Sequence, residues 1–407
     1  MAFVSLNQKF LVTGTLLDSD GSSIKLDGMI EDVMFRERYL VDYLPAVVVD
    51  FKTTQEIRDI MRDHNVRIAL RISYYNVADS NEQEEETDDI NEAGVIYEGI
   101  IRVYEKPFVT TSSKIDEDSD EDSTENQSTA APFVYYRISG VPEDLIEKNK
   151  KIVNKIYKNA KLADIVVNLL TDVNPYGDMY IQPLDDVEEY RNVLIPPSTT
   201  IAAINYLDTT YRLYNGNASV FFQPNKTYMY DPLSTDNVAE NTFTIKVKSV
   251  DNTTNTLEFQ IPKYDADTKA LMITLKTLPP FTRGSLIDED TLGSESIYYT
   301  YDDNFNIVSR TITNTDTYEK VRYNWNGYRK KEFEDNYNKF IRLQTAMNVS
   351  LSNIDPTLIT PMTRFVVDTD YSVANGDYFL SEKSYIISTN DMKHYNGLTN
   401  LSLIKRR

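Results

Sequence analysis

The chain contains no cysteine, which excludes disulfide bonds, thiolate metal sites and cysteine nucleophiles. The same absence is compatible with synthesis in a reducing cytoplasm. Histidine is also rare: His64 and His394 lie far apart in the sequence, and neither belongs to a pair with metal-ligand spacing. We therefore expect a structural or solvent-facing role for both histidines, and neither a metal site nor a cofactor.

Glycine is scarce, with 13 residues, whereas tyrosine is abundant, with 29. This balance favours strands and packed interfaces over a glycine-rich nucleotide-binding scaffold. The motifs GxSxG, GxxxxGKS/T, GxGxxG and HExxH are absent. We expect no catalytic residue and no enzymatic activity. A carboxylate pair for glycoside cleavage among the 63 acidic residues stays open, because only spacing in three dimensions decides it.

Long hydrophobic runs are missing as well. No apolar run approaches the roughly 20 residues that a membrane-spanning helix needs. The first ten residues, MAFVSLNQKF, lack a basic region followed by a long apolar core. We expect a soluble protein with no membrane insertion and no signal peptide.

Acidic residues are abundant and are concentrated in two short runs. The net charge is −21, and residues 79–92 hold eight acids and no base, while residues 114–125 hold seven acids and one lysine. Such runs cannot bury enough apolar surface to offset the entropy of ordering, so we expect two solvated, mobile loops. The overall charge argues against nucleic acid as a direct ligand.

The second acidic run contains a partial calcium-binding pattern. Asp116, Asp118 and Asp120 have the one-three-five spacing of a calcium loop. Glu121 occupies the sixth position, where the sharp turn needs glycine, and Gln127 occupies the twelfth, where a bidentate glutamate is expected. We therefore favour a solvated loop over a calcium site.

The hydrophobic periodicity predicts a mainly β, α+β protein in four parts. These are an N-terminal β domain (1–140) with acidic loops at 79–92 and 114–125, a helix-rich middle unit ending in two strands (141–235), a β region (236–327) and a C-terminal β domain (328–407). Predicted strands are 10–13, 43–51, 66–75, 95–104, 131–138, 242–250, 256–261, 341–351, 363–368 and 385–388. Predicted helices are 54–61, 142–160, 163–170, 198–214 and 328–340.

Two of these predictions depend on specific residue patterns. The prediction of a helix at 142–160 is based on Leu145, Ile152, Ile156 and Ala160, which would share one apolar face of a helix. Strands 242–250 and 256–261 both alternate and flank a short polar turn, which predicts a hairpin.

Residues 192–232 are the most clearly marked stretch of the chain. Ser198 follows two prolines and is a good N-cap, and Asn215-Gly216 is a suitable helix end. Between them one apolar stripe comprises Ile201, Ile204, Leu207, Tyr211 and Tyr214.

Two aromatic strands, 219–222 and 227–230, are predicted after this helix, with a turn between them. One interpretation of the tyrosines of 211–230 is that they line a sugar-binding site. Their spacing favours core or subunit interface.

Residues 341–351 form the longest predicted strand. Ile341, Leu343, Met347, Val349 and Leu351 alternate with polar residues, so they share one face. A strand of this length is typical of the wall of a β domain or barrel.

The elements between 141 and 232 have a recognisable order. They are a short amphipathic helix at 163–170, Leu-Ile-Pro-Pro at 194–197, a helix at 199–208, a turn at 212–216, the pair Phe221-Phe222 and an aromatic strand at 227–230. This order resembles the baseplate hub family of contractile-tailed bacteriophages, which is related to hub parts of type VI and other contractile injection systems. It covers about a quarter of the chain, and the two acidic runs depart from the family pattern.

The resemblance implies a structural virion protein, located in the tail baseplate and assembled in the host cytoplasm. It implies two tube-type β-barrel domains per chain and a homotrimeric ring of pseudo-sixfold symmetry. Such a ring would join the hexameric tail tube to a trimeric central spike protein and contact baseplate wedge proteins. DNA would pass an acidic lumen without specific binding.

Two alternatives stay open. One is another tail component of similar β texture, such as a tube-terminating, neck or wedge protein. The other, from a different class, is a carbohydrate-binding or depolymerising β protein.

Overall fold

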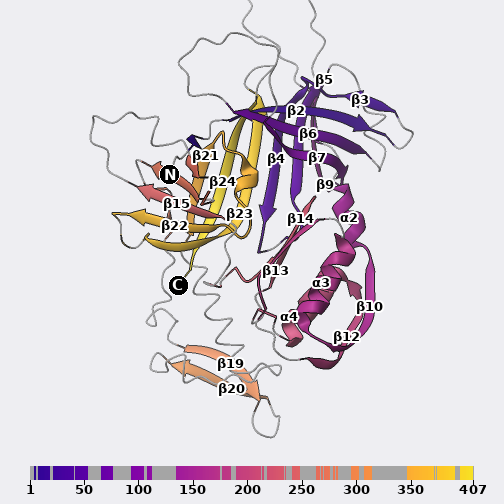
Figure 1. The fold of residues 1–407 in the computed structure, drawn as a ribbon, viewed down its shortest axis with the longest axis vertical. Helices are drawn as coiled ribbons and strands as arrows, with labels where there is room; N and C mark the ends of the chain where they lie inside the picture. Colours follow the sequence, from indigo (N-terminus) through magenta and orange to yellow (C-terminus); the bar gives the residue numbers. More distant parts are fainter. Residues whose placement is uncertain are drawn as a thin grey trace, which may run out of the picture.

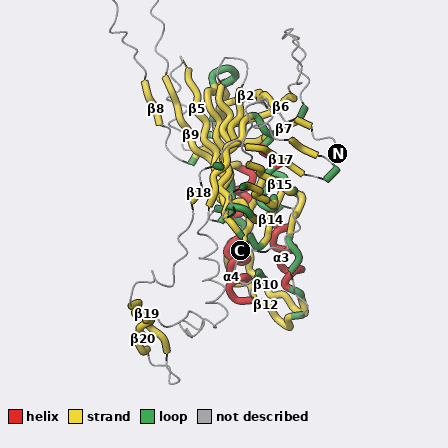
Figure 2. The backbone as a smooth tube through the Cα atoms, turned by 90° about the vertical axis from the view of Figure 1, so that its left-hand side faces the viewer, coloured by secondary structure: helices red, strands yellow, loops and turns green. Residues whose placement is uncertain are grey.

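The computed structural model shows a mainly β protein with a small helical unit (Figure 1). It describes residues 4–5, 8–18, 22–40, 42–53, 66–76, 93–104, 108–111, 134–174, 177–184, 189–211, 213–214, 218–232, 234, 241–247, 263–265, 267–268, 270–275, 278–279, 281–282, 295–301, 307–313, 346–370, 372, 374–389 and 395–406. Figure 2 shows most of the strands gathered at one end, with helices α3 and α4 below them.

The N-terminal part consists of strands. They are β1 (Val4–Ser5), β2 (Gln8–Leu17), β3 (Ser23–Lys25), β4 (Ile30–Arg38), β5 (Ala46–Thr53), β6 (Arg67–Asn76), β7 (Gly94–Val103), β8 (Phe108–Thr111) and β9 (Val134–Pro142). The five strands predicted in this part are confirmed, with shifted ends. Sequence patterns missed β1, β3, β4 and β8. In β4 charged residues interrupt the apolar signal, although Val33 and Phe35 are buried.

Eight strands form a closed cycle of pairings. Its order is β2, β6, β7, β9, β5, β4, β23 (Gly376–Thr389), β24 (Tyr395–Lys405) and back to β2, and every pair is antiparallel. Phe10 opposite Tyr395 closes the cycle. Buried side chains of these strands pack as one core, because each strand turns alternate residues inward.

A second sheet unit is built from later strands. They are β15 (Thr242–Val247), β16 (Lys263–Asp265), β17 (Ala270–Leu275), β18 (Phe281–Thr282), β21 (Ala346–Ser352) and β22 (Arg364–Thr369). In space the order is β1, β16, β17, β15, β22, β23, β24, β21 and β18. Met347, Val349 and Leu351 are buried in its core, as their alternation predicts.

The predicted hairpin of 242–250 with 256–261 is wrong for the described part of its first arm. Both edges of β15 are occupied by parallel neighbours, β17 on one side and β22 on the other. The second arm lies outside the described residues. Short-range alternation detects a strand but does not specify its partner.

The long hairpin β23–β24 belongs to both sheet units. Near its start, β23 pairs with β22 through Tyr378, and beyond a register shift at 380–382 it pairs with β4 as far as Ser388. β24 pairs with β21 and closes the cycle on β2. One continuous pair of strands therefore fixes the two sheet units to each other.

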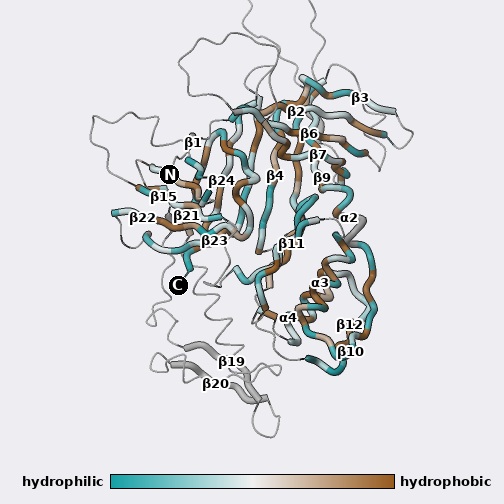
Figure 3. Tube along the Cα trace, in the orientation of Figure 1, coloured by the Kyte–Doolittle hydropathy of each residue, from teal (hydrophilic) through white to brown (hydrophobic). Residues whose placement is uncertain are grey.

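The middle of the chain forms a separate α/β layer. It comprises α2 (Glu143–Asn149), β10 (Ile152–Ala160), α3 (Leu162–Val173), β11 (Asp178–Ile181), β12 (Tyr190–Thr199), α4 (Thr200–Tyr211), β13 (Ser219–Gln223) and β14 (Lys226–Tyr230). Strands β10 and β12 form an antiparallel ribbon against α3 and α4, and β14 lies between β11 and β13. Figure 3 shows hydrophobic positions along both helices.

The predicted helix at 142–160 is wrong beyond α2. Residues 152–160 form strand β10, in which Ile152 and Ile156 are each 62% exposed. A spacing of four places two residues on one face of a helix and equally on one face of a strand, so this signal was ambiguous. Paired against β12, the β-branched residues adopt the strand.

The helix predicted at 198–214 is confirmed over Thr200–Tyr211 and shorter at both ends. Ser198 is not its cap: Ser198 lies in β12 and its Oγ donates to the carbonyl of Pro196 (2.8 Å). Instead the Oγ1 of Thr199 accepts a hydrogen bond from the Ala202 amide (3.4 Å). The predicted end at 215–216 lies outside the described residues.

The helix at 163–170 and the strands at 219–222 and 227–230 are confirmed as α3, β13 and β14. Several other predictions fall outside the described residues, namely both acidic runs and the helices at 54–61 and 328–340. A two-stranded antiparallel sheet, β19 (Glu295–Tyr301) with β20 (Ile307–Thr313), and the 3₁₀ turn η3 (Pro356–Leu358) complete the elements. The four-part domain division stays a prediction.

Candidate functional site

The residues considered in the sequence as possible metal ligands are not among those that the structure describes. His64, His394, Asp116, Asp118 and Asp120 all lie outside the described residues. Within the described ranges, no three histidine, aspartate or glutamate side chains are grouped to hold a metal ion. In the same ranges, no helix has both the length and the apolar character to span a membrane.

The most unusual chemistry of the described structure is a buried ion pair. The Nζ of Lys383 lies 3.0 Å from the Oε2 of Glu37, and their side chains are 2% and 5% exposed. The two residues are directly opposite each other in the antiparallel pair of β4 and β23. Removing two charges from water costs several kcal/mol each, so this pair needs further hydrogen bonds to be tolerated.

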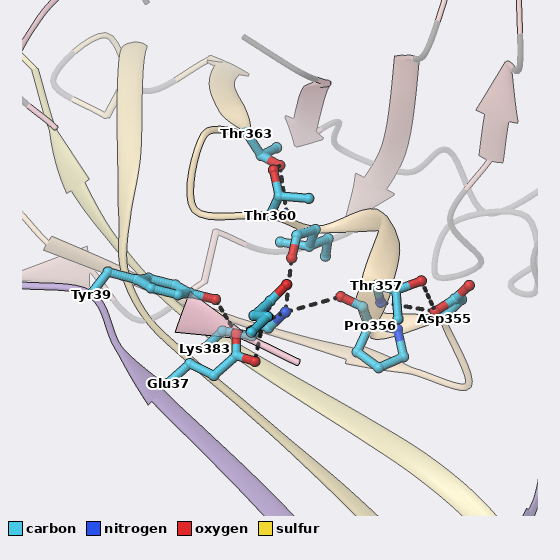
Figure 4. A network of polar contacts seen from close by, with 10 residues as sticks. Glu37, Tyr39, Asp355, Pro356, Thr357, Thr360, Thr363 and Lys383 are labelled. Atoms are coloured by element: carbon cyan, nitrogen blue, oxygen red, sulfur yellow. Dashed lines mark hydrogen bonds and ion pairs between the residues drawn. The ribbon is translucent and has the colours of Figure 1, made fainter. Parts of the chain in front are cut away.

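Lys383 uses all three of its ammonium hydrogens. Besides contacting Glu37, its Nζ donates to the carbonyl oxygens of Pro356 (3.1 Å) and Ile359 (2.9 Å) (Figure 4). Both carbonyls belong to the 3₁₀ turn η3 and its end. An ammonium group has three donors and no acceptor, so this arrangement satisfies it fully.

The η3 turn is itself fixed by local hydrogen bonds. The Oδ1 of Asp355 accepts from the amide and the hydroxyl of Thr357, at 2.8 and 2.7 Å. The Oγ1 of Thr363 accepts from the Thr360 amide at 2.9 Å. These caps hold the segment in the position that presents its carbonyls to Lys383.

Glu37 accepts from two further donors. The hydroxyl of Tyr39 donates to Oε2, and the Nε2 of Gln223 on β13 donates to Oε1 (3.2 Å). Burial, followed by the charge of Glu37, raises the pKa of Tyr39 well above its ordinary value. The Tyr39 hydroxyl therefore stays protonated and remains a donor.

The middle unit is attached at the same place. The hydroxyl of Ser219 donates to the carbonyl of Tyr39 (2.6 Å), and the amide of Phe222 donates to the carbonyl of Tyr43 (2.9 Å). The rings of Tyr39 and Phe221 pack edge to face with centroids 4.8 Å apart. We call the set Glu37, Tyr39, Gln223 and Lys383, with the η3 carbonyls, the polar junction.

The polar junction joins three parts of the chain that are distant in sequence. Glu37 comes from the closed cycle, Gln223 from the middle unit, and η3 from the second sheet unit. All its charged groups are enclosed and paired, so no reacting group is presented to a substrate. Its buried ion pair and hydrogen bonds fit a rigid contact between these three parts of the chain.

Sequence reasoning missed both charged members, although a signal was present. Glu37 follows Val33 and Phe35 at inward positions of β4, and Lys383 precedes Tyr385 and Ile387 at inward positions of β23. A charged residue at an inward position of an alternating strand indicates a buried partner of opposite charge.

The aromatic residues of the 211–230 stretch are core residues, except Tyr211, which is only partly buried. Phe221, Phe222, Tyr228 and Tyr230 are all fully buried, and Tyr228 stacks on Tyr180 with ring centroids 5.2 Å apart. Burial raises the pKa of the Tyr230 hydroxyl, so it stays protonated. For the tyrosines Tyr214, Tyr228 and Tyr230 the interpretation as core is confirmed.

Comparison with known proteins gives the family. The profile of the family described as "Bacteriophage PBS1 gene 109 protein" matches residues 1–405. The chain belongs to this bacteriophage protein family. The resemblance to phage proteins drawn from residues 141–232 is thereby confirmed, and so is the mainly β fold class. No curated protein matches the chain.

Several solved structures are similar over most of their length. They include the tail protein from Neisseria meningitidis MC58 (TM-score 0.46, 10% identity, 97% of each chain) and the 43 kDa tail protein of prophage MuSo2 from Shewanella oneidensis (TM-score 0.49, 9% identity, 98% of this chain and 97% of that one). A third is the E. coli c3393 protein, a component of the type VI secretion system described as similar to T4 bacteriophage tail proteins gp27 and gp5 (TM-score 0.41, 9% identity, 93% and 74%).

Proposed function

We propose that this phage protein is a structural component of the tail, a hub of the baseplate that forms a homotrimeric ring. The ring joins the hexameric tail tube to a trimeric central spike protein and contacts baseplate wedge proteins. It is assembled in the host cytoplasm and stays in the virion. No reaction and no cofactor are required of it.

The observation that carries this proposal is the joining of two sheet units within one chain. Both units share the hairpin β23–β24, and the polar junction locks the middle unit to them. A chain with two β units of the tube type presents six units as a trimer, which matches a sixfold tube on one side and a threefold spike on the other. A ring with that task needs fixed angles between its parts, and a continuous hairpin supplies them.

The charge of the chain supports one further part of the proposal. A net charge of −21 suits a lumen through which DNA passes, because a negative wall does not hold the phosphate backbone. An electropositive lumen in the assembled ring would contradict this part alone.

The test is the mass of the purified protein in solution, followed by imaging of the particle. We expect a stable trimer that appears as a threefold ring with a central hole. A monomer or a hexamer would favour the second candidate, a tube-terminating, neck or wedge protein of the tail. Cleavage of a host glycan would overturn the structural role and favour a depolymerising protein.

A further inference from the structure

The ribbon of β10 and β12 has one face in the core and one face in solvent. Val153, Val193 and Ile195 point inward and are fully buried against α3 and α4. On the outward face, Ile156 and Leu194 are direct cross-strand neighbours and are 62% and 52% exposed. The ribbon lies on the outer side of α3 (Figure 1), and in the described structure neither strand pairs with a third.

This outward face is apolar at its centre. Ile152, the first residue of β10, is 62% exposed, and Pro197 on β12 is exposed as well. Long aliphatic side chains grouped on one exposed strand pair are unusual for a surface that stays in water, and they indicate a contact site.

Basic residues flank the apolar centre along both strands of the ribbon. Residues 150–161 contain five lysines and residues 190–199 contain Arg191, and neither range contains an acid. All six basic residues are exposed. Asp172 of α3 pairs with Lys155 at 2.8 Å and with Lys151 at 3.9 Å and offsets part of this charge, whereas Lys158 and Arg191 form no ion pair within the described ranges.

The charge of the ribbon is opposite to that of the chain. The +6 of the ribbon segments against a net charge of −21 leaves −27 on the remaining residues. Copies of such a chain repel one another at most points of contact, and an exposed apolar face flanked by basic residues is where a second copy meets attraction as well as apolar burial. Nucleic acid fits less well, because the exposed centre is aliphatic and offers no aromatic ring for base stacking.

We propose that the outward face of the β10–β12 ribbon docks on the acidic surface of a second copy of this chain. This inference rests on the proposed homotrimer and names one of its contact surfaces. The ribbon covers roughly 30 Å by 10 Å, given about 3.3 Å per residue. This is less than the roughly 800 Å² per partner of a standard interface, so the ribbon strengthens a trimer that other surfaces also hold.

The test compares two double variants at the same positions. In Ile156→Thr/Leu194→Thr both side chains keep strand propensity and lose apolar area, whereas the control Ile156→Val/Leu194→Val keeps an apolar face. Sedimentation over a concentration series measures the midpoint of trimer dissociation, and circular dichroism with thermal melting confirms the fold. We expect the threonine variant to raise the midpoint concentration at least tenfold, and the valine control to change it much less.

A second pair of variants tests the charge and covers the case in which the threonine variant loses its fold. Lys158→Glu/Arg191→Glu should weaken the trimer, most strongly at low salt, and Lys158→Arg/Arg191→Lys should not. A trimeric wild type with both disruptive variants unchanged would overturn the ribbon contact and leave the hub proposal standing. A wild type that is monomeric at all concentrations would overturn the hub proposal itself. A variant that stays trimeric yet loses binding to the spike protein or to anionic vesicles would assign the ribbon to that partner and overturn the contact between copies.

Discussion

Glu37 and Lys383 face each other across β4 and β23, with their charged atoms 3.0 Å apart and almost no exposure to solvent. One belongs to the first tenth of the chain and the other lies near its end. Their pairing is the point at which the closed strand cycle, the middle unit and the η3 turn meet. This contact therefore helps to hold these three parts of the chain in place.

Breaking this pair should cost much more than breaking an exposed one. Lys383→Met leaves the Glu37 carboxylate buried without its counter-charge, so we expect a loss of about 3–5 kcal/mol in the free energy of unfolding. Glu382→Gln is the control, because its partner Arg36 lies 2.7 Å away with a side chain 49% exposed. That exposed pair should contribute less than about 1 kcal/mol. Urea denaturation measures both.

The double variant Glu37→Gln/Lys383→Met sharpens this prediction. Glutamine still accepts from Tyr39 and leaves no buried charge, so the double variant should be more stable than the sum of the single losses predicts, by about 1–3 kcal/mol. Strict additivity would contradict the interpretation that the two groups act as one pair.

The pH dependence of stability should change above pH 10. Burial raises the pKa of Tyr395 to about 12, and its hydroxyl donates to the carbonyl of Ile30 (2.8 Å). Between pH 10 and pH 12 the unfolded chain releases this proton and the folded chain keeps it, so its contribution to stability is complete below pH 10 and is lost as pH rises through 12. In the Tyr395→Phe variant, the free energy of unfolding should therefore fall less steeply between pH 10 and pH 12, by about 1.4 kcal/mol per pH unit.

Thermal melting at a series of alkaline pH values checks this prediction for Tyr395. Tyr43→Phe is the matched control, because its ring is 42% exposed. A decline equally steep in wild type and Tyr395→Phe would show that other groups cause it.

Gly140 should not tolerate a side chain. It lies in β9 between β5 and β7, opposite Val47 and Val103, and a Cβ there would lie 2.5 Å from the carbonyl oxygen of Arg102. Because a backbone atom cannot move without disturbing the pairing, Gly140→Ala should cost about 1–3 kcal/mol. The neighbour Ser139→Ala should stay within about 0.5 kcal/mol. Chemical denaturation that ranks the two variants equally would contradict the close approach.

Asp208 organises the connection from α4 to β13. Its carboxylate accepts hydrogen bonds from the amides of Tyr214 (3.2 Å) and Ala218 (3.0 Å), and its side chain is buried. Asp208→Ala leaves two amides without these acceptors, so we expect a loss of about 1–3 kcal/mol and faster hydrogen exchange at Ala218. Thr209→Ala, on the exposed side of the helix, should leave that amide protected. Unchanged exchange in Asp208→Ala would contradict the prediction.

Local pattern sufficed where an element buries a regular face by itself. Helix α3 was predicted because its apolar residues recur with helical spacing and most of them meet one core. The described part of β21 was predicted because Met347, Val349 and Leu351 alternate with polar residues. The hairpin β13–β14 follows from aromatic runs on both sides of a turn.

The sequence by itself thus determined the positions of fewer than half of the described strands, two of the helices, the absence of thiol chemistry and the similarity to a phage family. Tertiary structure alone decided that residues 152–160 pair with β12, that β15 lies between two parallel neighbours, and that Lys383 finds Glu37. The physical reason is the sequence separation between interacting groups. A helix satisfies its backbone hydrogen bonds within four residues, whereas a strand satisfies them with a second strand that its own sequence does not specify. A buried charge is likewise stable only beside a partner of opposite charge, which can come from a distant part of the chain.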